Sequence, residues 1–193
     1  TGDKFCFTCH PDMEKKYDKS KTKHAGLYLE KQCGTCHLAH YSAHKALANK
    51  NEKELCLSCH SKESRLEAYT PKDIASELKD KEYIHTPITE GECSSCHDPH
   101  GSSNNSLLVG QYPTSFYAPY DSDKYELCFN CHDQELLSEP QTDNYTLFRN
   151  GTNNLHFIHV GLARKGRTCQ SCHSPHASDG PRLINRTGAT FGA

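Results

Sequence analysis

The residues with the most evident chemistry in this chain are its cysteines. All twelve of them lie in one pattern, Cys-x-x-Cys-His, which occurs six times. Two cysteines three positions apart can form thioethers with both vinyl groups of one haem, and a histidine directly after the second cysteine then lies under the iron. Zinc knuckles and disulfide frameworks also use paired cysteines, but neither needs a histidine at that position. The pattern therefore predicts six covalently bound c-type haems.

The motifs assign eighteen residues to these haems, three to each. The predicted thioether-forming residues are Cys6, Cys9, Cys33, Cys36, Cys56, Cys59, Cys93, Cys96, Cys128, Cys131, Cys169 and Cys172. The predicted proximal iron ligands are His10, His37, His60, His97, His132 and His173.

The motifs alternate between two types, which reveals an internal repeat. In the first, third and fifth motifs (the odd motifs), a charged residue and an apolar one precede the first cysteine, as in Glu54-Leu55. The second, fourth and sixth motifs (the even motifs) each have a further histidine three positions after the proximal one. We therefore expect a single multihaem domain over residues 1–193, built from two-haem units at about 1–50, 51–105 and 124–180, with residues 106–123 as a linker loop.

The histidines outside the motifs supply candidates for the opposite face of each iron. Of the 14 histidines, six lie in the motifs, and another one precedes each even motif at a similar distance. The predicted distal ligands are His24, His40, His85, His100, His159 and His176. In front of the sixth motif, His159 is preferred to His156 because Phe157-Ile158-His159 matches Tyr83-Ile84-His85. His44 and His156 stay open as alternatives that could replace His40 or His159, or reach a haem of a neighbouring subunit.

Spacing also suggests which iron each distal histidine serves. A histidine three positions after a proximal ligand starts on the same side of its own porphyrin, so it should bind a different haem. We expect the odd-motif haem of the same unit to be served by His40, His100 and His176. The histidines that precede the even motifs have enough chain to cover the far face of the following haem, and these are His24, His85 and His159.

The pattern resembles the doubled-CxxCH multihaem cytochromes, a family that includes small periplasmic electron carriers and the haem chains of outer-membrane conduits. The resemblance covers nearly the whole chain and is most specific at Cys93 to His100 and Cys169 to His176, where the form CxxCHxPH is intact. The first unit departs from it, because Ala39 stands where the others have proline. The resemblance implies an exported electron-transfer protein, periplasmic or extracellular at the cell surface.

The elements that must position these residues are predicted to be short. Residues 43–50, 62–69 and 71–81 favour helices, the last with Pro71 near its start, and strand signals are nearly absent. Glycines, prolines and aromatic residues over 101–123 favour a long loop. The expected fold class is therefore mainly coil with short α-helices, wrapped around a chain of six haems, with almost no β structure.

Composition narrows the function further. Only 34% of the residues are hydrophobic, the net charge is −2 and the pI is near 6.7, so porphyrins must supply much of the apolar core and nucleic-acid binding is not expected. The sequence contains no run of about 18 apolar residues, so no transmembrane segment is expected. We read the chain as a mature, soluble protein.

Ligation by two histidines closes an iron to substrates and suits it to one-electron exchange. The leading interpretation is a non-enzymatic relay between a membrane-side redox donor and an acceptor outside the cytoplasm. The donor is expected to be a redox protein, and the acceptor is either a redox protein or an external electron acceptor. The relay could be a discrete carrier or conduit, or a homopolymeric filament joined by end-to-end haem contact. The alternative is a nitrite- or tetrathionate-type multihaem reductase with one open haem, although no Cys-x-x-Cys-Lys motif occurs. Met13, the single methionine, could serve one iron at most.

Overall fold

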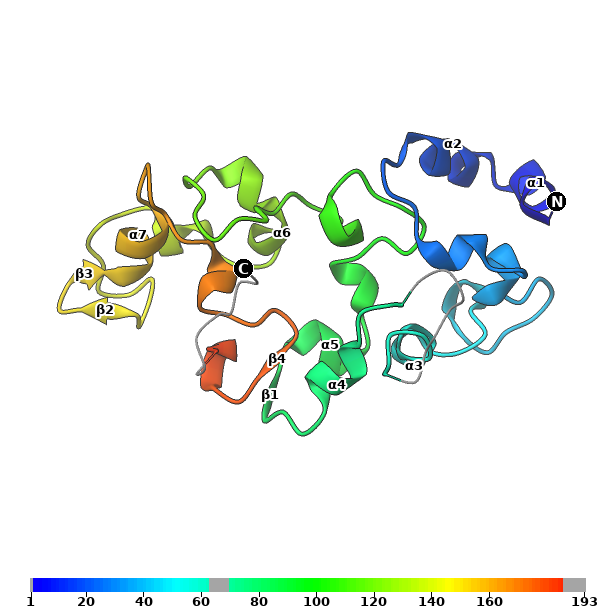
Figure 1. Cartoon of the computed structure of the whole chain (residues 1–193). Coiled ribbons are helices and arrows are strands. Elements are labelled where there is room, and N and C mark those ends of the chain that lie inside the picture. Colours follow the sequence, from blue (N-terminus) through cyan, green and yellow to red (C-terminus); the bar gives the residue numbers. More distant parts are fainter. Residues whose placement is uncertain (1, 63–69, 186–193) are drawn as a thin grey trace. The chain divides into compact units, whose positions relative to one another are not determined.

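The computed structural model describes residues 2–62 and 70–185, and most of this backbone is irregular (Figure 1). The α-helices are α1 (Gly2–Cys9), α2 (Pro11–Lys19), α3 (Glu52–Leu57), α4 (Ile74–Leu78), α5 (Thr86–Glu90), α6 (Glu126–Phe129) and α7 (Leu155–Val160). The 3₁₀ helices are η1 (Ala25–Tyr28), η2 (Gln32–Thr35), η3 (Lys45–Leu47), η4 (Cys93–Ser95), η5 (Asn105–Leu107), η6 (Ser122–Tyr125), η7 (Gln134–Leu137), η8 (Cys169–Ser171) and η9 (Pro181–Leu183). The two-residue strands are β1 (Tyr83–Ile84), β2 (Arg149–Asn150), β3 (Asn153–Asn154) and β4 (Ala177–Ser178). The predicted fold class is confirmed.

The chain divides into two compact units, residues 1–109 and residues 110–193. The boundary lies inside the predicted linker loop 106–123. Unit 1 carries the first four motifs and unit 2 carries the last two. The bounds of the predicted single domain and its three repeats stay predictions.

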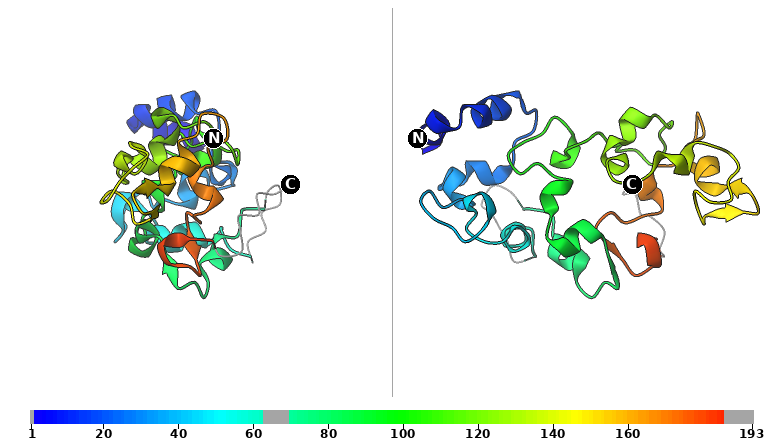
Figure 2. Two further views of the ribbon diagram at one scale, coloured as in Figure 1. Left: turned by 90° about the vertical axis from the view of Figure 1, so that its left-hand side faces the viewer. Right: turned by 180° about the vertical axis from the view of Figure 1, so that it is seen from behind.

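Unit 1 begins with α1 and α2, which follow one another along the chain (Figure 2). Farther on, α3 starts at Asn51, whose side chain accepts a hydrogen bond from the Glu54 N–H at 3.0 Å and so caps the helix. Helix α3 packs against η4, and the Glu52 carboxylate accepts the Ser94 N–H at 2.5 Å. An odd-motif helix thus packs against an even-motif turn.

The predicted helices of unit 1 are shorter in the structure. Within 43–50 only η3 forms, because Ala46 and Leu47 both have left-handed backbone angles with φ of 54° and 57°. Within 71–81 the helix is α4, which starts after Asp73, whose side chain accepts from the Ser76 N–H at 2.9 Å. The predicted helix over 62–69 lies almost wholly outside the described residues.

Unit 2 contains a small core of aromatic and aliphatic side chains. Tyr125 is fully buried and clusters with Leu137 and Val160, and Tyr112, Tyr120, Phe129, Leu136 and Cys169 pack around them. Strands β2 and β3 form an antiparallel hairpin whose turn contains Gly151 at φ 59°. Among the described residues only five hydrophobic side chains are buried, so this core is small for a chain of this length.

Candidate haem centres

All six motifs adopt the same local turn. In each, the N–H of the proximal histidine donates to the carbonyl of the first cysteine, four residues earlier, over 2.9–3.0 Å. This turn brings two cysteines and one histidine to a single short segment, as thioether attachment and axial ligation require. The odd motifs make it at the ends of α1, α3 and α6, and the even motifs make it in η2, η4 and η8.

The even motifs share a longer structure, which we call the even-motif loops: residues 33–49, 93–109 and 169–185. In each loop a serine five positions after the proximal histidine donates its hydroxyl to the carbonyl of the residue six positions farther on. The serines are Ser42, Ser102 and Ser178. Each loop also turns through two successive left-handed residues, at 46–47, 106–107 and 182–183. Three separate stretches of sequence therefore fold into one repeated form.

The even-motif loops orient the proximal histidines. The Nδ1 atoms of His37, His97 and His173 lie 2.9, 2.8 and 2.9 Å from backbone carbonyl oxygens nine residues later. In an odd motif, His60 Nδ1 lies 3.1 Å from the Lys72 carbonyl oxygen. Because a carbonyl can only accept, the proton must be on Nδ1 in each case, which leaves Nε2 as the metal-binding nitrogen.

Three pairs of histidine rings face each other in nearly parallel planes. His24 and His60 have ring centroids 6.1 Å apart with an interplanar angle of 18°, and His37 and His100 are 6.1 Å apart at 10°. In unit 2, His156 and His173 are 6.4 Å apart at 16°. Each pair joins one proximal histidine to one histidine from outside the motifs.

These separations fit an iron held between two imidazoles. A metal bound to Nε2 at about 2 Å on each side places the two ring centroids about 6 Å apart. Within 2–62 and 70–185, no group of three or more His, Cys, Asp or Glu side chains is placed to hold a metal ion. A pair of histidines suffices for haem, because the porphyrin supplies four further nitrogen ligands, whereas a tetrahedral zinc site needs more side chains.

Burial keeps the non-motif partners of these pairs neutral. It is the largest cause lowering the pKa of His24, His100 and His156 below the usual value, and neighbouring histidines lower each pKa further. For His100 the nearby Asp98 acts in the opposite direction. Neutral imidazole is the form that binds metal, so the surroundings favour ligation.

The observed pairs differ from the distribution that spacing predicted. His24 faces His60 of the third motif rather than His37, and His100 faces His37 of the second motif rather than His60. Spacing alone favours, for each distal ligand, a haem of the same predicted two-haem repeat. An antiparallel bridge between Thr22 and Ser102 instead brings two distant segments together.

In unit 2 the preference for His159 also differs from the geometry. His156 faces His173, whereas His159 is exposed and stacks on Phe148. The two histidines matched in sequence also differ in backbone setting, because His85 is the extended residue before α5, while His159 lies inside α7.

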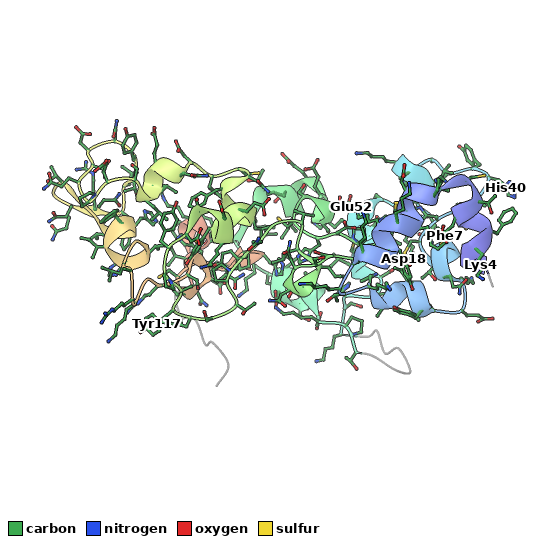
Figure 3. The ribbon with its side chains drawn as sticks, turned by 90° about the horizontal axis from the view of Figure 1, so that it is seen from above. Lys4, Phe7, Asp18, His40, Glu52 and Tyr117 are labelled. Atoms are coloured by element: carbon green, nitrogen blue, oxygen red, sulfur yellow. The ribbon has the colours of Figure 1, made fainter. Side chains whose placement is uncertain are left out.

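The other predicted distal ligands occupy different positions. His40 is exposed, at the end of unit 1 that carries Lys4 and Phe7 (Figure 3). His44, also exposed, precedes η3. His85 and His176 are half-buried, in the segment before α5 and in the third even-motif loop. Ligation by all six predicted distal histidines stays a prediction: His24, His40, His85, His100, His159 and His176.

The first cysteines of the third and fourth motifs lie together, and so do those of the fifth and sixth. A hydrogen bond between the Cys56 and Cys93 thiols is the largest cause raising the pKa of Cys56 and lowering the pKa of Cys93 to about 7. In the same way, a hydrogen bond from Cys128 is the largest cause lowering the pKa of Cys169. The third and fourth haem attachment sites are therefore adjacent, as are the fifth and sixth.

Sequence reasoning missed the residues that support the histidines. The loop serines and the leucines at Leu47, Leu107 and Leu183 recur at fixed distances after the even-motif histidines, so the same alignment that revealed the repeat could have found them. Thr146, which contacts His156, lies in no repeat and has no comparable signal.

Comparison with known proteins gives the same assignment as the motifs. The family model described as "Doubled CXXCH motif" matches residues 26–65, 85–136 and 160–191, which is more than half of the chain. The first two matches each contain an even motif and the next odd motif, so they are out of phase with the two-haem units predicted above.

A curated relative is the multihaem cytochrome MtrA of Shewanella baltica, which is 29% identical over 180 residues. The match covers 91% of this chain and 45% of the relative, so the chain spans less than half the length of that protein. Haem attachment, the repeated motifs and the family match agree. The chain belongs to the doubled-CXXCH family of multihaem c-type cytochromes, which transfer electrons.

Proposed function

We propose that this chain holds six bis-histidine c-type haems and relays electrons along them without catalysing a reaction on a substrate. The observation that carries the proposal is the set of three facing histidine pairs, at centroid separations of 6.1–6.4 Å. The count of six rests on six motifs with one common local turn. When bound, each iron supplies reversible one-electron exchange.

The protein's own contribution is to close both faces of the iron. His37 and His60 are fixed by their Nδ1 bonds to carbonyls, so their Nε2 atoms have a defined direction. In the proposed sites, His100 and His24 would bind the opposite faces of these irons and leave no position for a substrate, as their ring separations from His37 and His60 support. Closed irons with fixed ligands favour electron transfer over small-molecule reduction.

Contacts between attachment sites support transfer from haem to haem. The Cys56 and Cys93 sulfurs lie within hydrogen-bonding reach, and so do those of Cys128 and Cys169. In the mature protein these sulfurs carry no proton and each is bonded to a porphyrin edge, so their proximity would bring the edges of two haems together. We infer that electrons pass between the third and fourth haems and between the fifth and sixth.

We place this relay outside the cytoplasm, in the periplasm or at the cell surface, between a membrane-side donor and an extracytoplasmic acceptor. The family resemblance supports this location. No helix in the described ranges is long and apolar enough to cross a membrane. A discrete carrier or conduit is the form proposed, and the homopolymeric filament is the alternative.

Carbon monoxide binding to the fully reduced protein tests the closed irons. We expect almost no change in the Soret band on adding carbon monoxide, and a mass corresponding to six attached haems. A large carbon-monoxide difference spectrum would indicate an open iron and favour the reductase alternative. Negative-stain microscopy separates the two relay forms, because small particles alone would exclude the filament.

A further inference from the structure

Helix α7 presents two histidines, three residues apart, in front of the sixth motif. His156 lies in its first turn and His159 in its last. Residues three apart on a helix share a face, so the sequence alone gives either one access to the same neighbour. The surroundings of the two rings distinguish them.

His156 is aligned with the proximal histidine of the sixth motif. Its ring lies 6.4 Å from that of His173 with an interplanar angle of 16°. His173 Nδ1 donates to the Arg182 carbonyl at 2.9 Å, so its Nε2 is the nitrogen available to iron. An iron bound at that nitrogen needs a second axial ligand, and the His156 ring lies at the distance from the His173 ring that such a ligand would have.

A buried threonine fixes the other nitrogen of His156. Thr146 Oγ1 lies 2.8 Å from His156 Nδ1, and the Thr146 residue is only 7% exposed. The Phe148 N–H donates to the same oxygen at 3.0 Å and holds the hydroxyl in place. With Nδ1 engaged by Thr146, Nε2 is the nitrogen of His156 left for a metal, as an axial ligand requires.

The start of α7 is fixed by a fully buried asparagine. Asn154 Nδ2 donates to the carbonyls of Leu136 and Glu139, at 3.0 Å each, and Asn154 Oδ1 caps the helix by accepting the Phe157 N–H. His156 is therefore two residues from an anchored N-cap. Its position is set by the core of unit 2 rather than by a mobile loop.

His159 has different contacts. Its ring is exposed and stacks on Phe148 at 5.8 Å with an interplanar angle of 25°. Phe148 also meets His156 edge-on at 5.1 Å, so the phenyl ring lies against both histidines. This packing leaves His156 as the histidine of α7 that faces the sixth motif.

We propose that His156 is the distal ligand of the haem attached to Cys169 and Cys172, and that Thr146 is a positioning residue that accepts the Nδ1 proton of His156. The proposal rests on the proposed bis-histidine function and names the residue that completes the sixth site.

The ligand is tested by comparing two single variants of the full haem-loaded protein, with His156→Ala as the test and His159→Ala as the matched control on the same helix. We expect His156→Ala to bind about one carbon monoxide per six haems in the reduced state and to give a high-spin ferric signal. The proposal puts His156 in place of His159 as the distal ligand of the sixth site, so His159→Ala should keep the wild-type spectrum. Carbon monoxide binding by His159→Ala but not by His156→Ala would overturn the proposal, as would binding by neither.

A redox titration of His156→Met and carbon monoxide binding by the wild-type protein complete the test. If His156→Ala does not yield folded protein, His156→Met keeps a ligand and should raise one of six potentials, because methionine ligation stabilises the reduced iron. An unchanged redox titration of that variant would overturn the assignment. Carbon monoxide binding by wild-type protein would instead count against the proposed closed irons, so the two failures are distinguishable.

The positioning role is tested with Thr146→Val, Thr146→Ser and Thr142→Val. Thr142 is equally buried, at 7% exposure, and its hydroxyl oxygen accepts bonds from the Asn144 and Tyr145 N–H groups. We expect Thr146→Val to shift one of six potentials upward without opening the site, because the imidazole loses the acceptor that raises its basicity. Thr146→Ser should restore the wild-type titration and Thr142→Val should leave it unchanged. Equal shifts in the two valine variants would refute a specific role for Thr146.

Discussion

In four of the six proximal histidines, a single hydrogen bond decides which ring nitrogen can bind iron. Four proximal rings donate Nδ1–H to a backbone carbonyl, in the even motifs to the carbonyl nine residues later. Such a bond fixes the tautomer and the ring plane together, and it increases the electron donation of the imidazole to the metal. Because the acceptor is backbone, this effect does not depend on a particular side chain at positions such as Ala46 or Ser106.

At the scale of single residues, the pairing of His100 with His37 can be tested in unit 1. Replacing His100 with alanine should open one iron, because His100 is the histidine that faces His37. We expect carbon monoxide to bind about one of six haems in reduced His100→Ala protein. His44→Ala, which removes an exposed histidine from an even-motif loop, should leave the spectrum closed.

The identity of the opened haem follows from a second set of variants. If His100 serves the second motif, removing that haem through Cys33→Ala and Cys36→Ala should abolish carbon monoxide binding by His100→Ala. Removing the third haem through Cys56→Ala and Cys59→Ala should leave it. The reverse pattern would support the pairing expected from spacing and contradict the ring geometry.

At the scale of elements, His24 and His100 of unit 1 lie on either side of one small backbone contact. Thr22 and Ser102 exchange backbone hydrogen bonds in both directions at 2.9 Å, two residues from His24 and two from His100. Between His100 and Ser102, Gly101 has φ of 147°, a conformation that other residues rarely adopt. A Cβ at Gly101 would lie 2.9 Å from the Ser20 Cβ atom.

Gly101→Ala should therefore destabilise unit 1 more than a glycine replacement elsewhere. We expect a loss of roughly 1–3 kcal/mol from the strained backbone, with added cost from the contact with Ser20, measured by denaturant unfolding of the haem-loaded protein. Gly91→Ala is the control, because Gly91 also has a positive φ, of 83°, but its nearest neighbour would be 3.7 Å away. Equal losses in the two variants would show that close packing at the bridge is unimportant.

The repeated serine of the even-motif loops gives a second prediction at this scale. Ser102 Oγ donates to the Leu108 carbonyl at 2.6 Å and accepts the Asn104 N–H at 2.9 Å, so Ser102→Ala leaves that N–H unsatisfied. We expect a loss of about 1 kcal/mol in the free energy of unfolding. Ser103→Ala, at the exposed neighbouring position, should be nearly neutral, and a comparable loss there would contradict the role of Ser102.

At the scale of the whole molecule, the sequence predicts where each haem is attached better than it predicts which two histidines face each other. The cysteines and proximal histidines follow from a local pattern of five residues, and the coil-rich fold follows from low hydrophobicity. The pair His37 and His100 joins positions far apart in the chain, and no local spacing predicts that contact. The repeat favours His159 over His156, because the features that position His156, its contact with Thr146 and the capping of α7 by Asn154, lie outside the repeat.

The remaining question at this scale is what stabilises the fold. Only Ala118, Tyr125, Leu137, Val160 and Ala177 are buried hydrophobic residues in the described part of the chain. Many large apolar side chains are exposed, including Phe5 at 85% and Tyr41 at 77%. An apolar cofactor that covers such surfaces and joins distant histidines would contribute to folding directly.

Protein produced without haem attachment should consequently be unfolded. Burial of porphyrin and ligation by pairs such as His24 and His60 exist only in the loaded protein, so their free energy is absent from the apoprotein. We expect the far-ultraviolet circular dichroism of the apoprotein to resemble a random coil, with no cooperative thermal transition, while the loaded protein melts cooperatively. The measurement should be made under reducing conditions, because twelve free thiols could otherwise form disulfides. A cooperative, native-like transition in the reduced apoprotein would mean that the polypeptide core alone determines the fold.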